Sequence, residues 1–272
     1  MNRLKLLLVA GFSLVFWNSC QVGENFAGIN DSLIDQEVTS ENLLTELDAV
    51  TDEAVDLQLL LKSAETGLNF LTGTCPLKTF DQTSNPKVLT LDFGTGCKGA
   101  DGKMRSGKIV IKAGSFEDQT STRTKVFDNF FVEGKKVEGT ITKTIVVSSG
   151  DPSRIAKITE DITVTLPDGK VASRKGNLTR KYVMGVMADR SDNKMISWGE
   201  MVSTHRGGVV FKKSVPENTP LVFVPSCRQI VSGKVTFTVG SDRTWSIDYG
   251  KGECDNTAIV TRGTEVRTIK LR

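Results

Sequence analysis

Three stretches of this chain alternate apolar and polar side chains with a period of two residues, the pattern that most restricts its fold. In each stretch, valine, isoleucine and phenylalanine fall mostly on one face, and threonine, lysine and acidic residues fall mostly on the other. Side chains of a β-strand point alternately to opposite faces, so this pattern indicates antiparallel strands with one face in a core. The stretches are residues 137–147, 158–166 and 234–239.

Turn-forming residues separate such stretches throughout residues 73–272. Glycine, asparagine, aspartate and proline gather between the apolar runs, as in Pro167-Asp168-Gly169, and these residue types favour tight turns. Roughly ten to twelve strands fit into this range. The predicted fold is mainly β, an antiparallel meander over residues 73–272 that forms either a sandwich or a curled sheet.

Four of the five cysteines lie in this β region, and they indicate disulfides. The four are Cys75, Cys97, Cys227 and Cys254, an even number, and no two of them have the C-x-x-C spacing of a zinc site. Three connectivities are possible. We favour Cys75–Cys97 and Cys227–Cys254, because each pair then brackets a similar segment. Disulfides persist in oxidising compartments, so this pattern predicts an exported protein.

A short internal repeat accompanies these cysteines. The sequence from Leu91 to Cys97 matches that from Ile247 to Cys254 with one inserted residue, and both contain Asp-aromatic-Gly. The stretch Ser106–Ile111 also resembles Ser232–Phe237, although the two motifs follow in the opposite order along the chain. We interpret Asp-aromatic-Gly as a strand end that enters a tight turn, where glycine permits a positive φ.

The first 21 residues have the build of a secretory signal. A positively charged start is followed by an apolar run from Leu4 to Trp17 and then by Ser19-Cys20. The run is shorter than the about 20 residues of a transmembrane helix, and an ordinary secretory cleavage site would favour small residues at two positions. We therefore predict a lipoprotein signal peptide over residues 1–19 and lipidation of Cys20.

Residues 20–40 and 41–62 differ in pattern. The first range is polar and predicts a tether, whereas the second predicts an amphipathic helix because its apolar residues recur at helical spacing. Ser40 is positioned to cap this helix. We favour packing of the helix on the β domain over a free oligomerisation helix. The recurring apolar residues are Leu43, Leu47, Val50, Ala54, Leu57 and Leu61.

Charge is unevenly distributed along the chain. Residues 21–62 contain ten acidic side chains and one basic side chain, Lys62, whereas residues 63–272 contain 22 acidic and 32 basic side chains. An acidic arm of this kind can fold back on the basic body, or the body can face an acidic glycan or lipid headgroup. The basic residues form no dense run, so we expect a solvated basic surface and no nucleic-acid partner.

Three segments resemble a family of uncharacterised Bacteroidota-type lipoproteins: Leu91–Ile111, Val126–Thr140 and Ile247–Cys254. Trp17-Asn18-Ser19 before Cys20 also resembles the looser lipidation signals of such proteins. The similarity covers most of residues 73–272. It implies an exported, β-rich lipoprotein but supplies no activity and no functional residue.

Candidate catalytic and metal-binding residues are few. His205 is the single histidine, and we expect a surface side chain at a strand end beside Gly207-Gly208. Residues Asp189–Glu200 place oxygen-bearing side chains at calcium-loop positions, but Lys194 stands where that loop needs glycine. A hairpin turn explains this segment better. We predict no catalytic residues, no metal and no cofactor.

The sequence thus favours a non-enzymatic role at a membrane. We expect a lipoprotein anchored through Cys20 to the outer membrane of a cell envelope, with an envelope protein or a glycan as partner. The periplasmic face is favoured over the cell surface, because residues 21–25 lack a dense acidic run. The alternatives are an envelope hydrolase that acts on glycan or ester substrates and a carrier of an apolar ligand.

Overall fold

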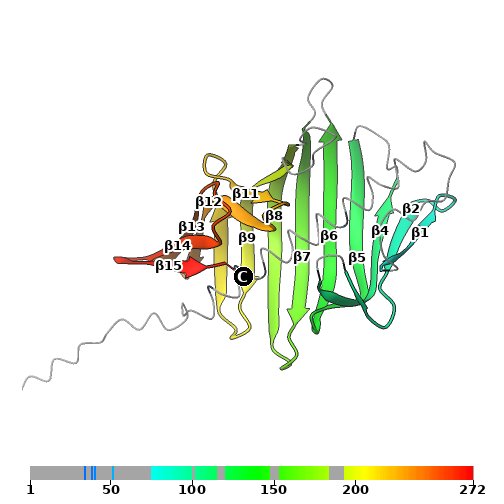
Figure 1. The fold of residues 1–272 in the computed structure, drawn as a ribbon, viewed down its shortest axis with the longest axis horizontal. Helices are drawn as coiled ribbons and strands as arrows, with labels where there is room; N and C mark the ends of the chain where they lie inside the picture. Colours follow the sequence, from blue (N-terminus) through cyan, green and yellow to red (C-terminus); the bar gives the residue numbers. More distant parts are fainter. Residues whose placement is uncertain are drawn as a thin grey trace, which may run out of the picture.

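One antiparallel sheet of fifteen strands forms the body of the protein (Figure 1). The computed structural model describes residues 34, 38, 40, 51, 75–99, 102–114, 120–147, 153–183 and 193–271. The strands are β1 (Leu77–Asp81), β2 (Lys87–Asp92), β3 (Cys97–Lys98), β4 (Met104–Ala113), β5 (Thr120–Val132), β6 (Lys135–Val147), β7 (Arg154–Thr165), β8 (Val171–Val183), β9 (Lys194–Thr204), β10 (Val210–Val215), β11 (Leu221–Val224), β12 (Gln229–Val239), β13 (Arg243–Lys251), β14 (Thr257–Arg262) and β15 (Glu265–Lys270).

The strand order follows the chain, as a meander requires. Neighbouring strands run β1-β2-β4-β5-β6-β7-β8-β9-β10-β12-β13-β14-β15, while the short β3 pairs with β4 and β11 pairs with β9 and β12. The long strands β4 to β9 form a broad sheet, and β12 to β15 run at a steep angle to them at one end (Figure 1). The mainly β meander is confirmed, and it is continuous as one curled sheet.

One strand position in this sheet is shared by β10 and β11. β10 pairs with the second half of β9, and β11 pairs with the first half, at Met195, Ile196 and Ser197. The five residues between β10 and β11 begin with Pro216 and end with Pro220. Proline lacks the N–H that a central strand donates, so these two prolines interrupt the strand.

One face of the sheet, which we call the inner face, is buried. Alternate side chains of each strand point to it, so that Ile109 lies opposite Phe127, and Ile158 lies opposite Leu178. Its apolar residues form two clusters, one from β2 to β9 and the other from β9 to β14 with Leu271, Ile34 and Val38. The period-two pattern of the sequence therefore identifies strands that bury one face.

The two halves of the internal repeat share their strand pairing and a local hydrogen bond at opposite ends of the sheet, although the predicted strand end holds only for the first, since Asp92 ends β2 and Asp248 lies within β13. Asp92 on β2 lies opposite Lys108 on β4, and Asp248 on β13 lies opposite Lys234 on β12. In both copies the aspartate Oδ1 accepts the backbone N–H of the glycine two residues later, at 2.8 and 2.9 Å. That hydrogen bond and the Lys108 ammonium, 3.0 Å away, hold the pKa of Asp92 below its usual value.

A glycine lies opposite the turn in each copy. The backbone N–H of Gly107 donates to the carbonyl of Gly94, and the carbonyl of Gly107 accepts from the backbone N–H of Phe93. Gly107 therefore lies opposite two residues of the other strand, Phe93 and Gly94. Gly233 takes the equivalent place beside Asp248. The geometry of an antiparallel strand pair is the same when its two strands are exchanged. The two motifs can therefore form similar structures although their order along the chain is reversed.

Both disulfides join the pairs expected from the sequence. Cys75 precedes β1 and bonds to Cys97, and Cys227 precedes β12 and bonds to Cys254. Cys97 and Cys254 each follow an Asp-aromatic-Gly turn by a few residues. The disulfides therefore tie the two repeat turns to neighbouring parts of the sheet.

The N-terminal predictions fall mostly outside the described residues. These include the signal peptide over 1–19, Cys20, most of the tether over 20–40 and all of the 41–62 helix except Thr51. Ile34, Val38 and Ser40 are helical, so helix is present inside the range predicted as a tether, and Ser40 is not a cap outside the helix. The i, i+4 spacing of Ile34 and Val38 is the signal that indicates it. Among the residues that the structure describes, no helix is both long and apolar enough to span a membrane.

Replacement of Gly107 by alanine tests the repeat turn. A Cβ at Gly107 would lie 1.9 Å from the backbone oxygen of Asn129, and the φ of +78° disfavours any L side chain. We expect Gly107→Ala to lower the free energy of unfolding by at least about 2 kcal/mol. Gly114→Ala is the control, because no atom lies within 4 Å of that Cβ. Urea denaturation of both variants measures the difference, and equal stabilities would contradict the assignment.

Removal of either disulfide tests its contribution to stability. The pairs close loops with sequence separations of 22 and 27 residues. In the chain-entropy account, loss of a loop of this size costs about 3 kcal/mol. We therefore expect Cys75→Ala/Cys97→Ala and Cys227→Ala/Cys254→Ala to lower the free energy of unfolding by similar amounts. The reduced wild-type protein should match the combined loss, and a double variant as stable as the oxidised wild type would contradict the assignment.

Candidate functional site

In the described part of the chain, seven buried, positively charged side chains point to the inner face of the sheet: one is Arg105 of β4, and we call the six from β5 to β10 the inner basic patch. None of them exposes more than 6% of its surface. A buried charge is costly unless it is paired and hydrogen-bonded, so each of them needs a polar or charged neighbour. The patch consists of Arg123, Lys125, Lys143, Arg174, Arg180 and Lys213.

Strand register brings five of these residues into two groups. Arg123 on β5 lies directly opposite Lys143 on β6, and Lys125 is on the same face two residues further along β5. On the other side, Lys213 of β10 lies opposite Met201 of β9, which in turn pairs with Gly176, two residues from Arg174. Like charges in adjacent register positions repel one another, so neighbouring groups must offset this repulsion.

Hydroxyl groups of β8 and β9 accept hydrogen bonds from two of the cations. The Lys143 ammonium donates to the Tyr182 hydroxyl oxygen at 2.6 Å and lies 5.0 Å from the centre of its ring. The Arg180 Nε donates to Ser197 Oγ at 2.8 Å. These contacts fix the orientation of the two cations.

Glu160 supplies a negative charge to the same face. Its Oε2 lies 2.8 Å from Arg174 Nε, and both side chains are more than nine-tenths buried. Among the described residues, Glu160 is the one buried carboxylate. The pair is an ion pair inside the inner face, and its net contribution depends on the desolvation of both groups.

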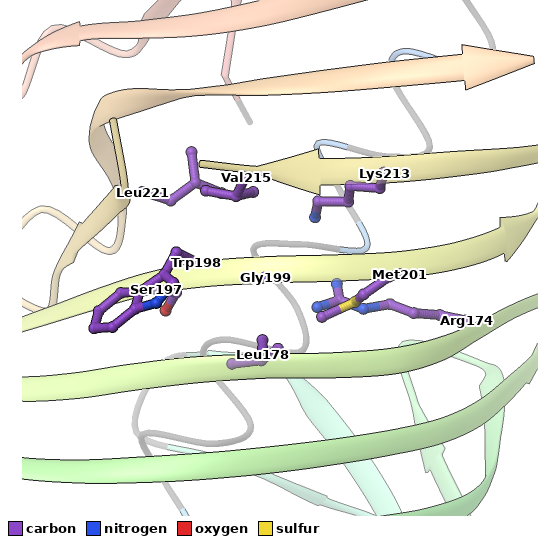
Figure 2. A pocket seen from close by; sticks show the side chains of 9 residues that line it. All are labelled: Arg174, Leu178, Ser197, Trp198, Gly199, Met201, Lys213, Val215 and Leu221. Carbon is purple, nitrogen blue, oxygen red and sulfur yellow. The ribbon is translucent and has the colours of Figure 1, made fainter. Parts of the chain in front are cut away.

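A small pocket lies where β10 and β11 meet, and Arg174 and Lys213 help to line it (Figure 2). These two cations lie at one end of the pocket, and Ser197 and Trp198 lie at the other (Figure 2). Its cavity volume is about 10 Å³, room for about one water molecule. Sites for drug-sized ligands hold about 300–1,000 Å³ and are mostly apolar. This pocket therefore gives no support to a carrier of apolar ligands.

His205 is buried, so the expectation of a surface side chain was wrong. It lies in the turn after β9 with 7% of its surface exposed. Its Nδ1 accepts the backbone N–H of Gly207 at 3.0 Å, and its backbone N–H donates to the carbonyl of Val209. The tight turn thus folds the imidazole over Gly207.

The calcium-loop positions that the structure describes do not converge. Ser197 points to the inner face, where it accepts from Arg180, whereas the exposed Glu200 points outward and pairs with Lys212 at 2.9 Å. Side chains on opposite faces of one strand cannot bind the same ion. Residues 189–192 lie outside the described residues.

The sequence interpretation missed the inner basic patch. It placed the basic residues of the body on a solvated surface, and the structure corrects this for the six residues of the patch. Strand parity carries the signal, since Arg123 and Lys125 share the face of Phe127. Comparisons with family models, with curated proteins and with solved structures found no match.

Loss of Glu160 tests the buried ion pair. Glu160→Gln removes the negative charge beside Arg174, and breaking one side of a buried pair costs about 3–5 kcal/mol of unfolding free energy. Glu160→Leu/Arg174→Met removes both charges and should cost less than the single change. Urea denaturation measures both variants.

The neighbouring residue supplies a matched control for this test. Asp161 pairs with Lys175 at 2.6 Å, but both side chains are exposed, at 61% and 73%. Exposed pairs contribute about 0–1 kcal/mol, so Asp161→Asn should have little effect. If Glu160→Gln were as stable as Asp161→Asn, the buried pair would have no part in stability.

Proposed function

We propose that this protein is a lipoprotein of a bacterial cell envelope, anchored through Cys20, whose β domain has a non-enzymatic binding or structural role. One observation carries the proposal: the two disulfides use all four cysteines of the β domain and leave Cys20 over. Disulfides indicate an oxidising compartment. An unpaired cysteine directly after a signal-like segment fits a site of lipidation.

The anchor follows from the chemistry of acylation. A single acyl chain holds a protein at a membrane only marginally, while several chains hold it stably. A triacylated Cys20 would therefore keep the β domain at the membrane surface. We place it on the outer membrane and favour the periplasmic face, because residues 21–25 contain Glu24 as their one acidic residue. The resemblance to Bacteroidota-type lipoproteins supports the same location.

The state of the candidate catalytic residues supports a binding or structural role. His205 Nδ1 is engaged by the Gly207 N–H, and Glu160 is held by Arg174 inside the inner face. Acid–base catalysis needs a group that can reach the proton to be transferred. The partner that we propose is another envelope protein or a glycan, and no nucleic acid.

Replacement of Cys20 tests the anchor. We expect the wild-type protein to incorporate labelled palmitate and to yield a mature chain that begins at Cys20, and we expect Cys20→Ala to lose the label. A chain with residues 1–20 exchanged for an ordinary cleavable signal should be soluble in the periplasm. Palmitate labelling, membrane fractionation and mass spectrometry of the N-terminus measure these outcomes.

The disulfide variant Cys75→Ala/Cys97→Ala is the control, since it should keep the label. Retention of palmitate by Cys20→Ala, or a mature N-terminus elsewhere, would contradict the anchor. Cross-linking in native envelopes should join the anchored protein to a protein or glycan in stoichiometric amount. An empty capture would contradict the binding role.

A further inference from the structure

The inner face of the sheet needs a second layer to cover it. β4 to β10 belong to one continuous sheet, yet inner-face residues such as Lys143 and Ile158 expose no more than 2% of their surface. A sheet buries a face only against another packed layer. The strands that turn across the sheet, β12 to β15, do so at one end (Figure 1).

The N-terminal region supplies described residues to this layer. Ile34, Val38 and Thr51 are helical and expose 1%, 5% and 1% of their surfaces. Ile34 and Val38 belong to the same apolar cluster as Phe211 and Trp245. Helix from the N-terminal region therefore packs on the inner side of the β domain.

Charge complementarity points to the same segment. The inner basic patch has six cations, and Glu160 is the buried carboxylate beside them among the described residues. None of the six is left without an interaction partner. Residues 21–62 contain ten acidic side chains and a single basic one. Desolvated cations are stable only beside opposite charge, and this segment is the most acidic part of the chain.

We propose that the acidic segment of residues 21–62 forms the second layer over the inner basic patch and that its carboxylates neutralise the buried cations. Residues three apart on a helix lie on the same side. Glu37 is three residues after Ile34, Glu41 is three after Val38, and Asp48 is three before Thr51. In the proposed layer, each of these three carboxylates shares a side of the helix with one of the buried residues, and it is this side that covers the patch.

This inference goes beyond the proposed function, since it holds whether or not Cys20 carries lipid. The acidic segment occupies the place that an external acidic glycan or lipid headgroup would need. An outside partner of the β domain therefore binds elsewhere than on the inner basic patch.

Matched neutralisations on the two sides of the helix test the proposal. Glu37→Gln/Glu41→Gln/Asp48→Asn removes carboxylates predicted to face the patch. Glu46→Gln/Glu53→Gln/Asp56→Asn makes the same chemical changes at positions five, two and five residues from Thr51, on the side of a helix away from Thr51. Both triple variants of the full chain raise the net charge equally.

Two measurements report the outcome. Acylation of lysines, read by mass spectrometry, compares Lys125, Lys143 and Lys213 with the exposed Lys175 in the same sample. Loss of a charge-assisted hydrogen bond favours local opening by about tenfold. We expect the first variant to raise labelling of the three buried lysines by at least this factor and to lower the urea midpoint, while the second variant changes neither.

Several results would overturn the proposal. The first is equal labelling of Lys125, Lys143 and Lys213 in both variants, and the second is labelling of these lysines in the wild type as fast as that of Lys175. Protection that is lost when a dimer dissociates on dilution would assign the layer to a second copy of the chain. Should the triple variant not fold, Asp48→Asn against Asp56→Asn repeats the comparison with one charge each.

Discussion

A single antiparallel sheet has two faces, and in this protein one face is buried in a core. The strands of the sheet cannot cover that face by themselves. The period-two pattern makes the inner face apolar along β2 to β14. Curling brings β12 to β15 across one end (Figure 1). Helical residues Ile34 and Val38 pack into the same cluster. The covering of the inner face is thus the condition under which the meander is stable.

Burial of charge sets a second requirement on that face. Hydrophobic side chains would fill the same positions more simply, because a buried ion pair often adds little stability over an apolar pair. The six cations of the inner basic patch and Glu160 instead restrict what can pack there, since any cover must offer acceptors and negative charge at matching places. We regard this selectivity as the reason for the uneven charge of the chain, acidic over residues 21–62 and basic beyond.

The two ends of the sheet use the same construction. At each end an Asp-aromatic-Gly turn faces a glycine of the neighbouring strand, and a disulfide joins the segment just beyond the turn to a nearby part of the sheet. The aromatic residues Phe93 and Tyr249 are buried, which couples each turn to the apolar cluster at its end of the sheet. Both turns are therefore held by backbone geometry, by packing and by a covalent bond.

The β class and the antiparallel order followed from local patterns in the sequence, because alternation and turn residues are properties of neighbouring positions. The sequence predicted roughly ten to twelve strands where the described residues form fifteen, and it favoured the observed cysteine pairing among three possible ones. Only the tertiary structure decided that a strand face is buried when that face carries charged residues. Arg123 and Lys125 share a face with Phe127, but parity along a strand does not say what covers that face. His205 was misplaced for a related reason, since a turn that folds back on its own side chain leaves no periodic signal. Burial depends on residues distant in sequence, and only the assembled sheet brings these together.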